Sequence, residues 1–437
     1  MKMWVNLLIT KHWADLNKEN KTGTLRYVPK SRFNKRNISK EKLKKYEKDF
    51  ANVENKVITN TVTKNGFFKS CENYEEVRNS RYDFSVNLKQ GEVTDQKRSG
   101  RCWIFASTNF IRYFLIKKLN IVNIELSQNY IAFYDKLEKC NYFLNSIINT
   151  IDRPTTDRHV TFFLDNPIND GGQWDMFLNI IKKYGIVPKS AMPETYNSSN
   201  TLEINKILKR ILRMYAYELR EDYKNNKSLE EIENKKLEMI EKIYNILCTA
   251  FGKPPKEFNF EYTNKKDEFF RENNITPIEF YNKYVKDLNL EDYISIINAP
   301  NADRPFFKKY TVNYVGNVAE GNKITYLNLP IERLKEMAIA QLTDSVPVFF
   351  GSDVGQESSR DLGILSRSLY NINELINIED SMNKATKLEY RESAMTHAMM
   401  FLGVNLDENW KGNRWKVENS WGNAAGNKGM YLLTDEW

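Results

Sequence analysis

A cysteine at the start of a long apolar run is the first residue in this chain whose surroundings suit covalent chemistry. Cys102 stands in the stretch SGRCWIFA, and the run over residues 102–119 is apolar on almost every helical face. A helix that is apolar all round is a buried helix, so Cys102 is expected to begin a central one. The unpaired N–H groups and the dipole at a helix N-terminus stabilise a thiolate. Taken alone, the same cysteine could equally be a small apolar core residue.

A thiol nucleophile needs a proton acceptor, and the chain has only three histidines, His12, His159 and His397. His12 lies in a basic N-terminal stretch, and His159 in DRHVTFF is expected at a strand edge with no obvious partner. His397 in AMTHAMMFLGV is expected to head a strand. It is therefore the candidate general base, although a histidine inside an apolar strand is often a core residue instead.

Two amides complete a candidate acyl-transfer site. Asn419 in VENSWGN follows an expected strand and could orient the His397 ring through its side-chain oxygen, although asparagine is also common in turns. Trp421 could shield that hydrogen bond from water. Gln96 lies six residues before Cys102, and its amide, together with the Cys102 backbone N–H, could donate to an oxyanion. The predicted catalytic residues are thus Cys102, His397, Asn419 and Gln96.

The elements that must position these residues form a helical first half and a strand-rich end. Helical periodicity predicts helices over 38–50, 125–146 (one helix or a pair) and 201–248. Apolar runs between turn residues predict strands over 346–355, 398–405, 414–422 and 429–435. This order of elements predicts an α+β protein. The expected divisions are a basic extension over 1–37, a helical half over 38–200, a helical insertion over 201–290 and a β-rich half over 291–437.

The composition excludes several other classes of protein. Four cysteines in 437 residues, Cys71, Cys102, Cys140 and Cys248, are too few and too scattered for a disulfide framework, and they fit a reducing compartment. No apolar run approaches the roughly eighteen residues of a membrane span, so a cytoplasmic protein is expected. Metal-ligand spacings and phosphate-binding glycine loops are both missing from the sequence, so no metal and no cofactor are expected.

The net charge of +8 is concentrated at one end of the chain. Residues 1–37 hold nine Lys or Arg and two acidic residues, a net charge of +7, so the rest of the chain is nearly neutral. Such an arm is usually a solvated tail. It leaves weak nucleic-acid binding as an alternative function of a different class.

The order glutamine, cysteine–tryptophan, histidine and NSWG resembles the papain-like cysteine peptidases. Two features resemble one branch of them, the bleomycin hydrolase and aminopeptidase C family: Arg101 precedes the cysteine, and His397 follows it by 295 residues, about twice the usual interval. Further stretches resemble the same branch, namely NTVTKNG (60–66), NDGGQWDMFLNIIKKYGIVPKSAMPETYNSSNT (169–201), GSDVG (351–355), MTHAM (395–399) and ENSWGN (418–423).

The resemblance implies a papain-like fold with helical insertions, in which a helical and a β-rich half flank a cleft. It implies an aminopeptidase for small or unfolded peptides, with Cys102 as nucleophile, His397 as general base and then acid, and Asn419 as the residue that orients it. Gly171 and Gly172 match the loop whose backbone pairs with the main chain of the substrate. Family members commonly form hexamers around an internal chamber, so a homo-hexamer is expected.

Departures from the family pattern leave alternatives open. Residues 1–37 match nothing in the family. The chain ends at TDEW, whereas family members continue into a tail that reaches the cleft and restricts cleavage to the N-terminal residue. Without that tail, an endopeptidase or a peptidase of relaxed specificity is the alternative. Ser352 stands where the family usually has cysteine, a change expected to alter packing only.

Overall fold

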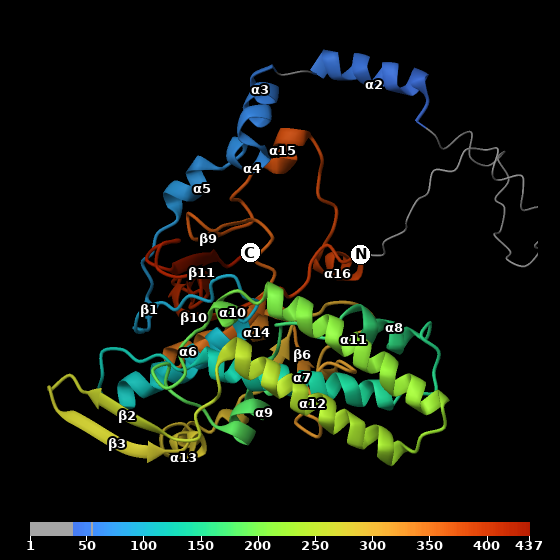
Figure 1. The fold of residues 1–437 in the computed structure, drawn as a ribbon. Coiled ribbons are helices and arrows are strands. Elements are labelled where there is room, and N and C mark those ends of the chain that lie inside the picture. The colour runs from blue at the N-terminus through green and yellow to red at the C-terminus, as the bar shows by residue number, and fades with distance from the viewer. Residues whose placement is uncertain (1–37, 54–55) are drawn as a thin grey trace, which may run out of the picture. The chain divides into compact units, whose positions relative to one another are not determined.

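The helix expected over residues 38–50 forms and belongs to an N-terminal unit of the chain. The computed structural model describes residues 38–53 and 56–437, and the chain divides after Ser70 into two units. The first unit contains α2 (Lys40–Val53), α3 (Lys56–Asn65) and α4 (Phe67–Ser70) (Figure 1). The basic arm over residues 1–37 lies outside the described residues.

The second unit is built around the helix that begins at Cys102. This helix, α6 (Cys102–Lys118), is buried over most of its length, as its apolar sequence predicted. It packs against strand β10 (His397–Leu406) and against helices α7 (Gln128–Ile148) and α9 (Trp174–Tyr184). The central helix and the strand that it contacts therefore each begin with a predicted catalytic residue.

Strand β10 lies inside a seven-stranded sheet. It pairs on one side with β11 (Gly412–Glu418), and on the other with β7 (Val348–Ser352) and then β1 (Val86–Asn87). Beyond β11 the sheet continues with β12 (Met430–Thr434), β9 (Ile364–Leu365) and β8 (Ser358–Ser359). The four strands predicted near the end of the chain are confirmed as β7, β10, β11 and β12.

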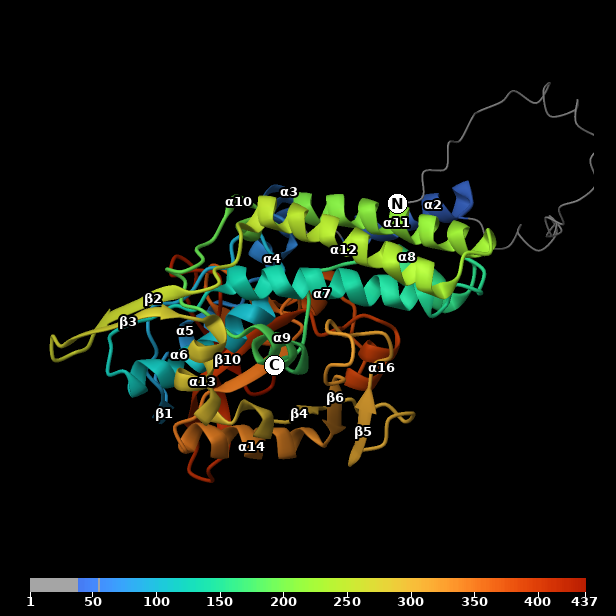
Figure 2. The ribbon, with the colours of Figure 1, turned by 60° about the horizontal axis from the view of Figure 1, so that its bottom comes forward.

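The segment expected to be a helical insertion contains two long helices and also a β-hairpin. Helices α11 (Leu202–Lys224) and α12 (Leu229–Phe251) pack on each other and on α7, and the three run side by side in Figure 2. Strands β2 (Phe258–Thr263) and β3 (Phe269–Ile275) then pair as an antiparallel hairpin. Helix was predicted only over 201–248, so this hairpin is an element of the expected insertion that the sequence analysis did not include. In FNFEYT the aromatic residues alternate with polar ones, which is the period of a strand.

The remaining elements are shorter, and one of them corrects a prediction. His159 lies in the first turn of α8 (Arg158–Asp165) rather than at a strand edge. The other helices are α5 (Tyr74–Asn79), α10 (Tyr196–Ser199), α13 (Pro277–Tyr284), α14 (Ile331–Thr343), α15 (Ile372–Ile376) and α16 (Lys384–Glu389). A second sheet holds β4 (Ser295–Ile297), β6 (Thr325–Asn328) and β5 (Lys308–Thr311). Within the described ranges, no helix has both the length and the apolar character needed to cross a membrane.

A buried ion pair joins α6 to the seven-stranded sheet. Arg112 Nη2 donates to Glu418 Oε1 at 2.7 Å, and the two side chains are 1% and 0% exposed. The same carboxylate also accepts hydrogen bonds from the side-chain amides of Gln90 and Asn109. Because Glu418 ends β11, this network fixes the central helix against the strand that leads to Asn419.

Replacing Glu418 by alanine is expected to destabilise the protein strongly, because the Arg112 cation would stay buried without its partner. Removing one member of a buried pair typically costs about 3–5 kcal/mol, whereas replacing both members by apolar residues of similar volume is often neutral. The double variant Arg112→Met/Glu418→Leu should therefore unfold at a higher temperature than Glu418→Ala. Thermal unfolding followed by circular dichroism measures both. A Glu418→Ala protein as stable as the parent would contradict this role of the pair.

Candidate active site

The His397 imidazole and the Asn419 amide are hydrogen-bonded where β10 begins and β11 ends. Nε2 of the ring lies 2.8 Å from Oδ1 of the amide, and both side chains are buried. The same amide oxygen accepts from the backbone N–H of Ser420 at 2.8 Å. A backbone N–H can only donate, so the amide atom between the two is the oxygen, and His397 carries a proton on Nε2. Nδ1 is then the ring nitrogen that can accept a proton from a nucleophile.

Strand pairing brings these two residues together across 22 positions of sequence. Strands β10 and β11 are antiparallel, with Met400 opposite Glu418, so the start of one lies beside the end of the other. On the other side of β10, Ser352 lies opposite His397. The Ser352 hydroxyl is buried and makes no hydrogen bond within the part of the chain that the structure describes.

The Trp421 indole lies against the His397 imidazole. The two ring centres are 4.8 Å apart, and the ring planes are inclined by 33°. Tyr431 packs edge-to-face on the indole at 5.7 Å, and the Arg360 guanidinium lies 5.1 Å from an indole ring centre. An aromatic ring and a cation therefore hold the indole beside His397.

Cys102 lies at the N-terminus of α6 beside the start of β10. Burial has the largest effect on its thiol and raises the pKa above the usual value. Backbone N–H groups of Ala398, Trp103 and Cys102 itself act in the opposite direction and lower the pKa. Backbone N–H groups of Ala398 and of the first turn of α6 thus favour the thiolate, but burial outweighs them. Since Ala398 follows His397, the sulfur lies next to the residue that heads β10.

The imidazole is also shifted toward its neutral form. Burial lowers the pKa of His397, and the hydrogen bond with Asn419 offsets only part of that effect. Among the hydrogen bonds of the described residues, none joins the Cys102 thiol to the His397 ring. Taken separately, the thiol and the imidazole are therefore both neutral near pH 7.

The Gln96 side chain is held at both of its polar atoms. Ser420 Oγ donates to Gln96 Oε1 at 2.6 Å, and Gln96 Nε2 donates to the Ser99 carbonyl oxygen at 2.6 Å. A carbonyl oxygen can only accept, so Nε2 is the amide atom on the Ser99 side, towards the turn that leads into Cys102. One Nε2 hydrogen is used there, and the second takes part in no hydrogen bond among the described residues.

The loop with Gly171 and Gly172 lies against the first turn of α6. The Trp103 indole N–H donates to the Asp170 carbonyl oxygen at 2.6 Å, and the Lys139 ammonium donates to the Gly171 carbonyl oxygen at 2.6 Å. A Cβ atom on Gly172 would meet the Trp103 ring at 2.4 Å, so only glycine fits there. The predicted substrate loop therefore adjoins the residue that directly follows Cys102.

The Asp170 carboxylate connects the Gly171–Gly172 loop to several other elements. It accepts from the Gly100 backbone N–H at 3.1 Å, the Thr201 hydroxyl at 2.5 Å, the Lys136 ammonium at 2.6 Å and the Asn205 amide at 2.9 Å. Burial opposes ionisation of this carboxyl, but Lys136 and the hydrogen bonds together hold its pKa well below the usual range. Asp170 thus ties α7 and α11 to the turn before Cys102. Its partners lie far away in sequence, so no local pattern indicated this role.

His159 takes no part in this site. His159 is exposed and contacts the Arg153 side chain through Nδ1 at 3.0 Å. His12 lies outside the described residues. Within 38–53 and 56–437, no group of three or more His, Cys, Asp or Glu side chains is placed to hold a metal ion.

Acid unfolding is expected to report on Asp170. The pKa of this carboxyl is lower in the folded chain than in the unfolded chain, where it is about 3.9. The unfolded state therefore binds more protons than the folded state as the pH falls. The stabilisation from Asp170 is therefore complete above about pH 5 and is lost as the pH drops below about 4. Asp170→Asn should lower the unfolding temperature at pH 7, and its difference from the parent should shrink between about pH 5 and pH 3.

Asp303, whose side chain is 74% exposed, provides the matched control, and Asp303→Asn should change the unfolding temperature little at any of these pH values. A difference between Asp170→Asn and the parent that does not vary with pH would contradict the assigned ionisation.

The chain is similar to known cysteine peptidases over most of its length. Residues 37–437 match the Peptidase C1-like family. Aminopeptidase C of Streptococcus thermophilus is 45% identical over 387 residues, which are 89% of this chain and 87% of that protein. Bleomycin hydrolase of Homo sapiens is 41% identical over 362 residues, which are 82% of this chain and 80% of that protein.

A solved structure agrees with this similarity. The crystal structure of PepW from Lactobacillus rhamnosis matches with a TM-score of 0.90 at 43% identity, covering 92% of this chain and 90% of that one. The papain-like fold expected from the sequence is thereby confirmed, and so is the resemblance on which it rested. The chain belongs to the Peptidase C1-like family.

Proposed function

We propose that this chain is a cysteine aminopeptidase that removes N-terminal residues from peptides through an acyl-enzyme on Cys102. One observation carries the proposal: the hydrogen bond from His397 to Asn419 leaves Nδ1 able to accept a proton, on a residue whose neighbour Ala398 contacts the Cys102 sulfur. Relatives named aminopeptidase C and bleomycin hydrolase, each more than 40% identical, support the same activity.

Acylation begins with proton transfer from the Cys102 thiol to Nδ1 of His397. The thiolate then attacks the carbonyl carbon of the first peptide bond, and the electron pair of the carbonyl moves to oxygen. The Cys102 backbone N–H and the second Nε2 hydrogen of Gln96 donate to this oxyanion. When it collapses, the C–N bond breaks, the imidazolium protonates the leaving amine, and a thioester remains on Cys102.

Deacylation reuses the same groups with water in place of the amine. His397 takes a proton from the water molecule, whose oxygen attacks the thioester carbonyl. Collapse of the second oxyanion releases the amino acid and returns the sulfur as a thiolate. The proton held on His397 then restores the thiol.

Burial makes the first proton transfer depend on close approach of the two side chains. A thiolate or an imidazolium alone is disfavoured there, whereas the two charges formed side by side stabilise each other. Asn419 accepts the Nε2 hydrogen in both protonation states and so prevents the His397 ring from turning. We expect the contact between sulfur and Nδ1 to tighten when substrate binds, as is common for catalytic hydrogen bonds.

Peptides bind, in this proposal, with their main chain along Gly171 and Gly172. Gly171 is exposed, and Gly172 cannot carry a side chain because Trp103 occupies the space. A backbone free of side chains lets an extended peptide approach closely and pair with it. Small or unfolded peptides are the proposed substrates because only an extended main chain can make such a pairing.

Cys102→Ala is expected to abolish peptide hydrolysis because no other group in the site can form the acyl intermediate. We expect kcat/KM with a free-amine fluorogenic substrate to fall by about 10⁴-fold or more. Cys248, which is half-buried on α12, supplies the control, and Cys248→Ala should keep the parental rate. Iodoacetamide should inactivate the parent in step with labelling of Cys102, read by peptide mass spectrometry. Hydrolysis at the parental rate by Cys102→Ala would overturn the proposal.

The choice between aminopeptidase and endopeptidase is tested with the substrate rather than the protein. Aminoacyl and N-acetyl-aminoacyl derivatives of the same fluorophore differ only in the free amine. An aminopeptidase that recognises the amine should cleave the acetylated compound about 100-fold or more slowly. Equal rates for the pair, or preferential cleavage inside longer blocked peptides, would favour the endopeptidase alternative.

Assembly as a homo-hexamer and residence in the cytoplasm are further parts of the proposal. The thiols of Cys102, Cys140 and Cys248 are free, which fits a reducing compartment. Leu43, Tyr46 and Phe50 on α2 are each about half exposed and offer apolar surface that an assembly would bury. Nucleic-acid binding has weaker support, since it rests only on the charge of residues 1–37.

A further inference from the structure

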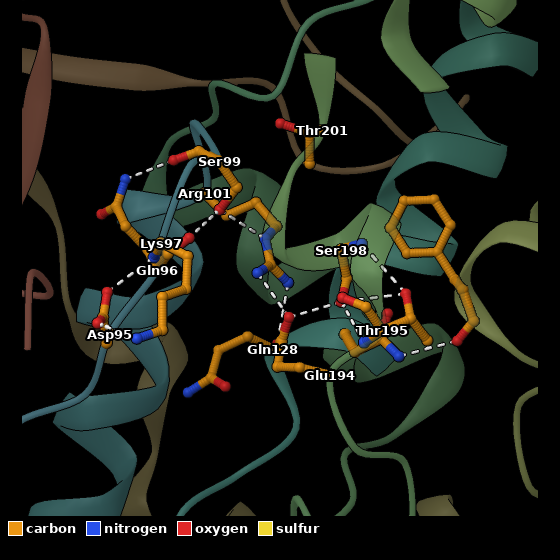
Figure 3. A network of polar contacts seen from close by, with 12 residues as sticks. Asp95, Gln96, Lys97, Ser99, Arg101, Gln128, Glu194, Thr195, Ser198 and Thr201 are labelled. Atoms are coloured by element: carbon orange, nitrogen blue, oxygen red, sulfur yellow. Dashed lines mark hydrogen bonds and ion pairs between the residues drawn. The ribbon is translucent and has the colours of Figure 1, made fainter. Parts of the chain in front are cut away.

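Arg101 carries a buried positive charge that the proposed reaction does not use. It directly precedes Cys102 at the N-terminal end of α6, and its side chain is 2% exposed. Its guanidinium donates to both carboxylate oxygens of Glu194, from Nη1 to Oε1 at 3.1 Å and from Nη2 to Oε2 at 2.7 Å (Figure 3). Two parallel bonds of this kind fix orientation as well as distance. The ion pair therefore holds the residue beside the nucleophile in one place and at one angle.

The remaining nitrogen of this guanidinium reaches the turn that carries Gln96. Arg101 Nε donates to Ser99 Oγ at 3.0 Å. That hydroxyl donates to the Gln96 carbonyl oxygen at 2.6 Å, and Gln96 Nε2 donates back to the Ser99 carbonyl oxygen at 2.6 Å. Within this turn Lys97 has a φ of 53°, in the left-handed region that is uncommon for residues other than glycine. Side-chain hydrogen bonds in both directions close the turn, and Arg101 holds the Ser99 hydroxyl that makes one of them.

Glu194 is itself fixed by the segment that opens α10. Its Oε2 atom accepts from Ser198 Oγ at 2.6 Å, and Ser198 forms a capping box with Thr195. The Thr195 hydroxyl donates to the Ala250 carbonyl oxygen at 2.9 Å, near the end of α12. The carboxylate that receives Arg101 is therefore anchored to two helices.

We propose that the Arg101–Glu194 ion pair is a positioning device for the oxyanion site. It fixes the Ser99 hydroxyl, which in turn fixes Gln96 so that its second Nε2 hydrogen faces the substrate carbonyl oxygen. The inference rests on the proposed function, because it takes Gln96 as the oxyanion donor. Arg101 and Glu194 touch no reacting atom and act through Ser99. Removing the pair should slow acylation and leave the reactivity of the Cys102 thiol unchanged.

The informative variant removes both charges together. Leaving one buried charge without its partner is strongly destabilising, whereas replacing both by apolar residues is often neutral. Arg101→Met/Glu194→Leu should therefore unfold at nearly the same temperature as the parent. A single substitution such as Glu194→Ala would mix loss of position with loss of stability.

Two rates measured on this variant separate positioning from a general structural effect. The first is hydrolysis of a free-amine fluorogenic substrate, and the second is alkylation of Cys102 by iodoacetamide. Alkylation displaces iodide without forming an oxyanion, so it reports on the thiol alone. We expect kcat to fall by about 10-fold or more, towards the roughly 100-fold that loss of an oxyanion donor causes, with KM and the alkylation rate within about twofold of the parent.

Ser99→Ala is the second variant, and it removes only the hydroxyl through which the pair acts. It should show the same selective loss of kcat with an unchanged alkylation rate. It also keeps the test decisive if Arg101→Met/Glu194→Leu fails to fold. Unchanged kcat in Ser99→Ala, or alkylation that slows in parallel with hydrolysis, would overturn the inference.

Combination with Gln96→Ala tests the route by which the pair acts. If the ion pair works only through the Gln96 side chain, adding Arg101→Met/Glu194→Leu to Gln96→Ala should cause no further loss of kcat. Losses that multiply would show a separate route and would overturn the inference. Full activity in Gln96→Ala would instead contradict the oxyanion role in the proposed function. A loss in Gln96→Ala beside unchanged activity in the pair variant would overturn only the positioning role.

Arg220 supplies a matched control for removing a buried arginine. Its side chain is buried, and Nη1 donates to the Thr150 carbonyl oxygen at 3.1 Å. Arg220→Met should lower the unfolding temperature while kcat stays at the parental value. An equal loss of kcat in Arg220→Met would mean that the assay reports stability rather than position, and the inference would fail.

Discussion

The arrangement of this site depends on two opposite charges buried between the central helix and the sheet. Arg112 lies on the helix that begins at Cys102, and Glu418 directly precedes Asn419. Arg112 also donates to the carbonyl oxygen of Glu92, in the segment that leads to Gln96. Separating these charges would leave each one unpaired inside the protein, at a cost of several kcal/mol. The three segments that carry the Cys102 thiol, the Asn419 amide and the Gln96 side chain are therefore held in one frame.

Within that frame, hydrogen bonds form one continuous line, and each fixes the direction of the next group. The Ser420 backbone N–H identifies the oxygen of the Asn419 amide, and the Ser99 carbonyl identifies the nitrogen of the Gln96 amide. The donor and acceptor of each hydrogen bond in the line are therefore defined. In the proposed mechanism, this arrangement leaves Nδ1 of the His397 ring able to accept a proton. It also leaves the Gln96 amide with one hydrogen to donate. The line runs through His397, Asn419, Ser420, Gln96, Ser99, Arg101 and Glu194.

The helices outside the sheet do more than cover the core. Asp170 links the Gly171–Gly172 loop and the turn before Cys102 to α7 and α11, and Glu194 links the same turn to α10 and α12. In both links a buried cation pairs with a partly buried carboxylate whose oxygens are bonded on several sides, which favours a single geometry. Helices α7, α10, α11 and α12 thus hold the loop and the turn that lie next to Cys102.

Local pattern determined much of this protein. Several features can be predicted without a structure because they depend on neighbours a few positions away. They are the apolar sequence of α6, the periodicity of α11, α12 and the late strands, and the residue types at Cys102 and His397. The alternation in FNFEYT is also a local pattern, and it is typical of the strand that forms there. Only the tertiary structure decided which polar residues support the site. Arg101 meets Glu194 across 93 positions and Arg112 meets Glu418 across 306, and such distant pairings depend on how the elements pack rather than on any spacing along the chain.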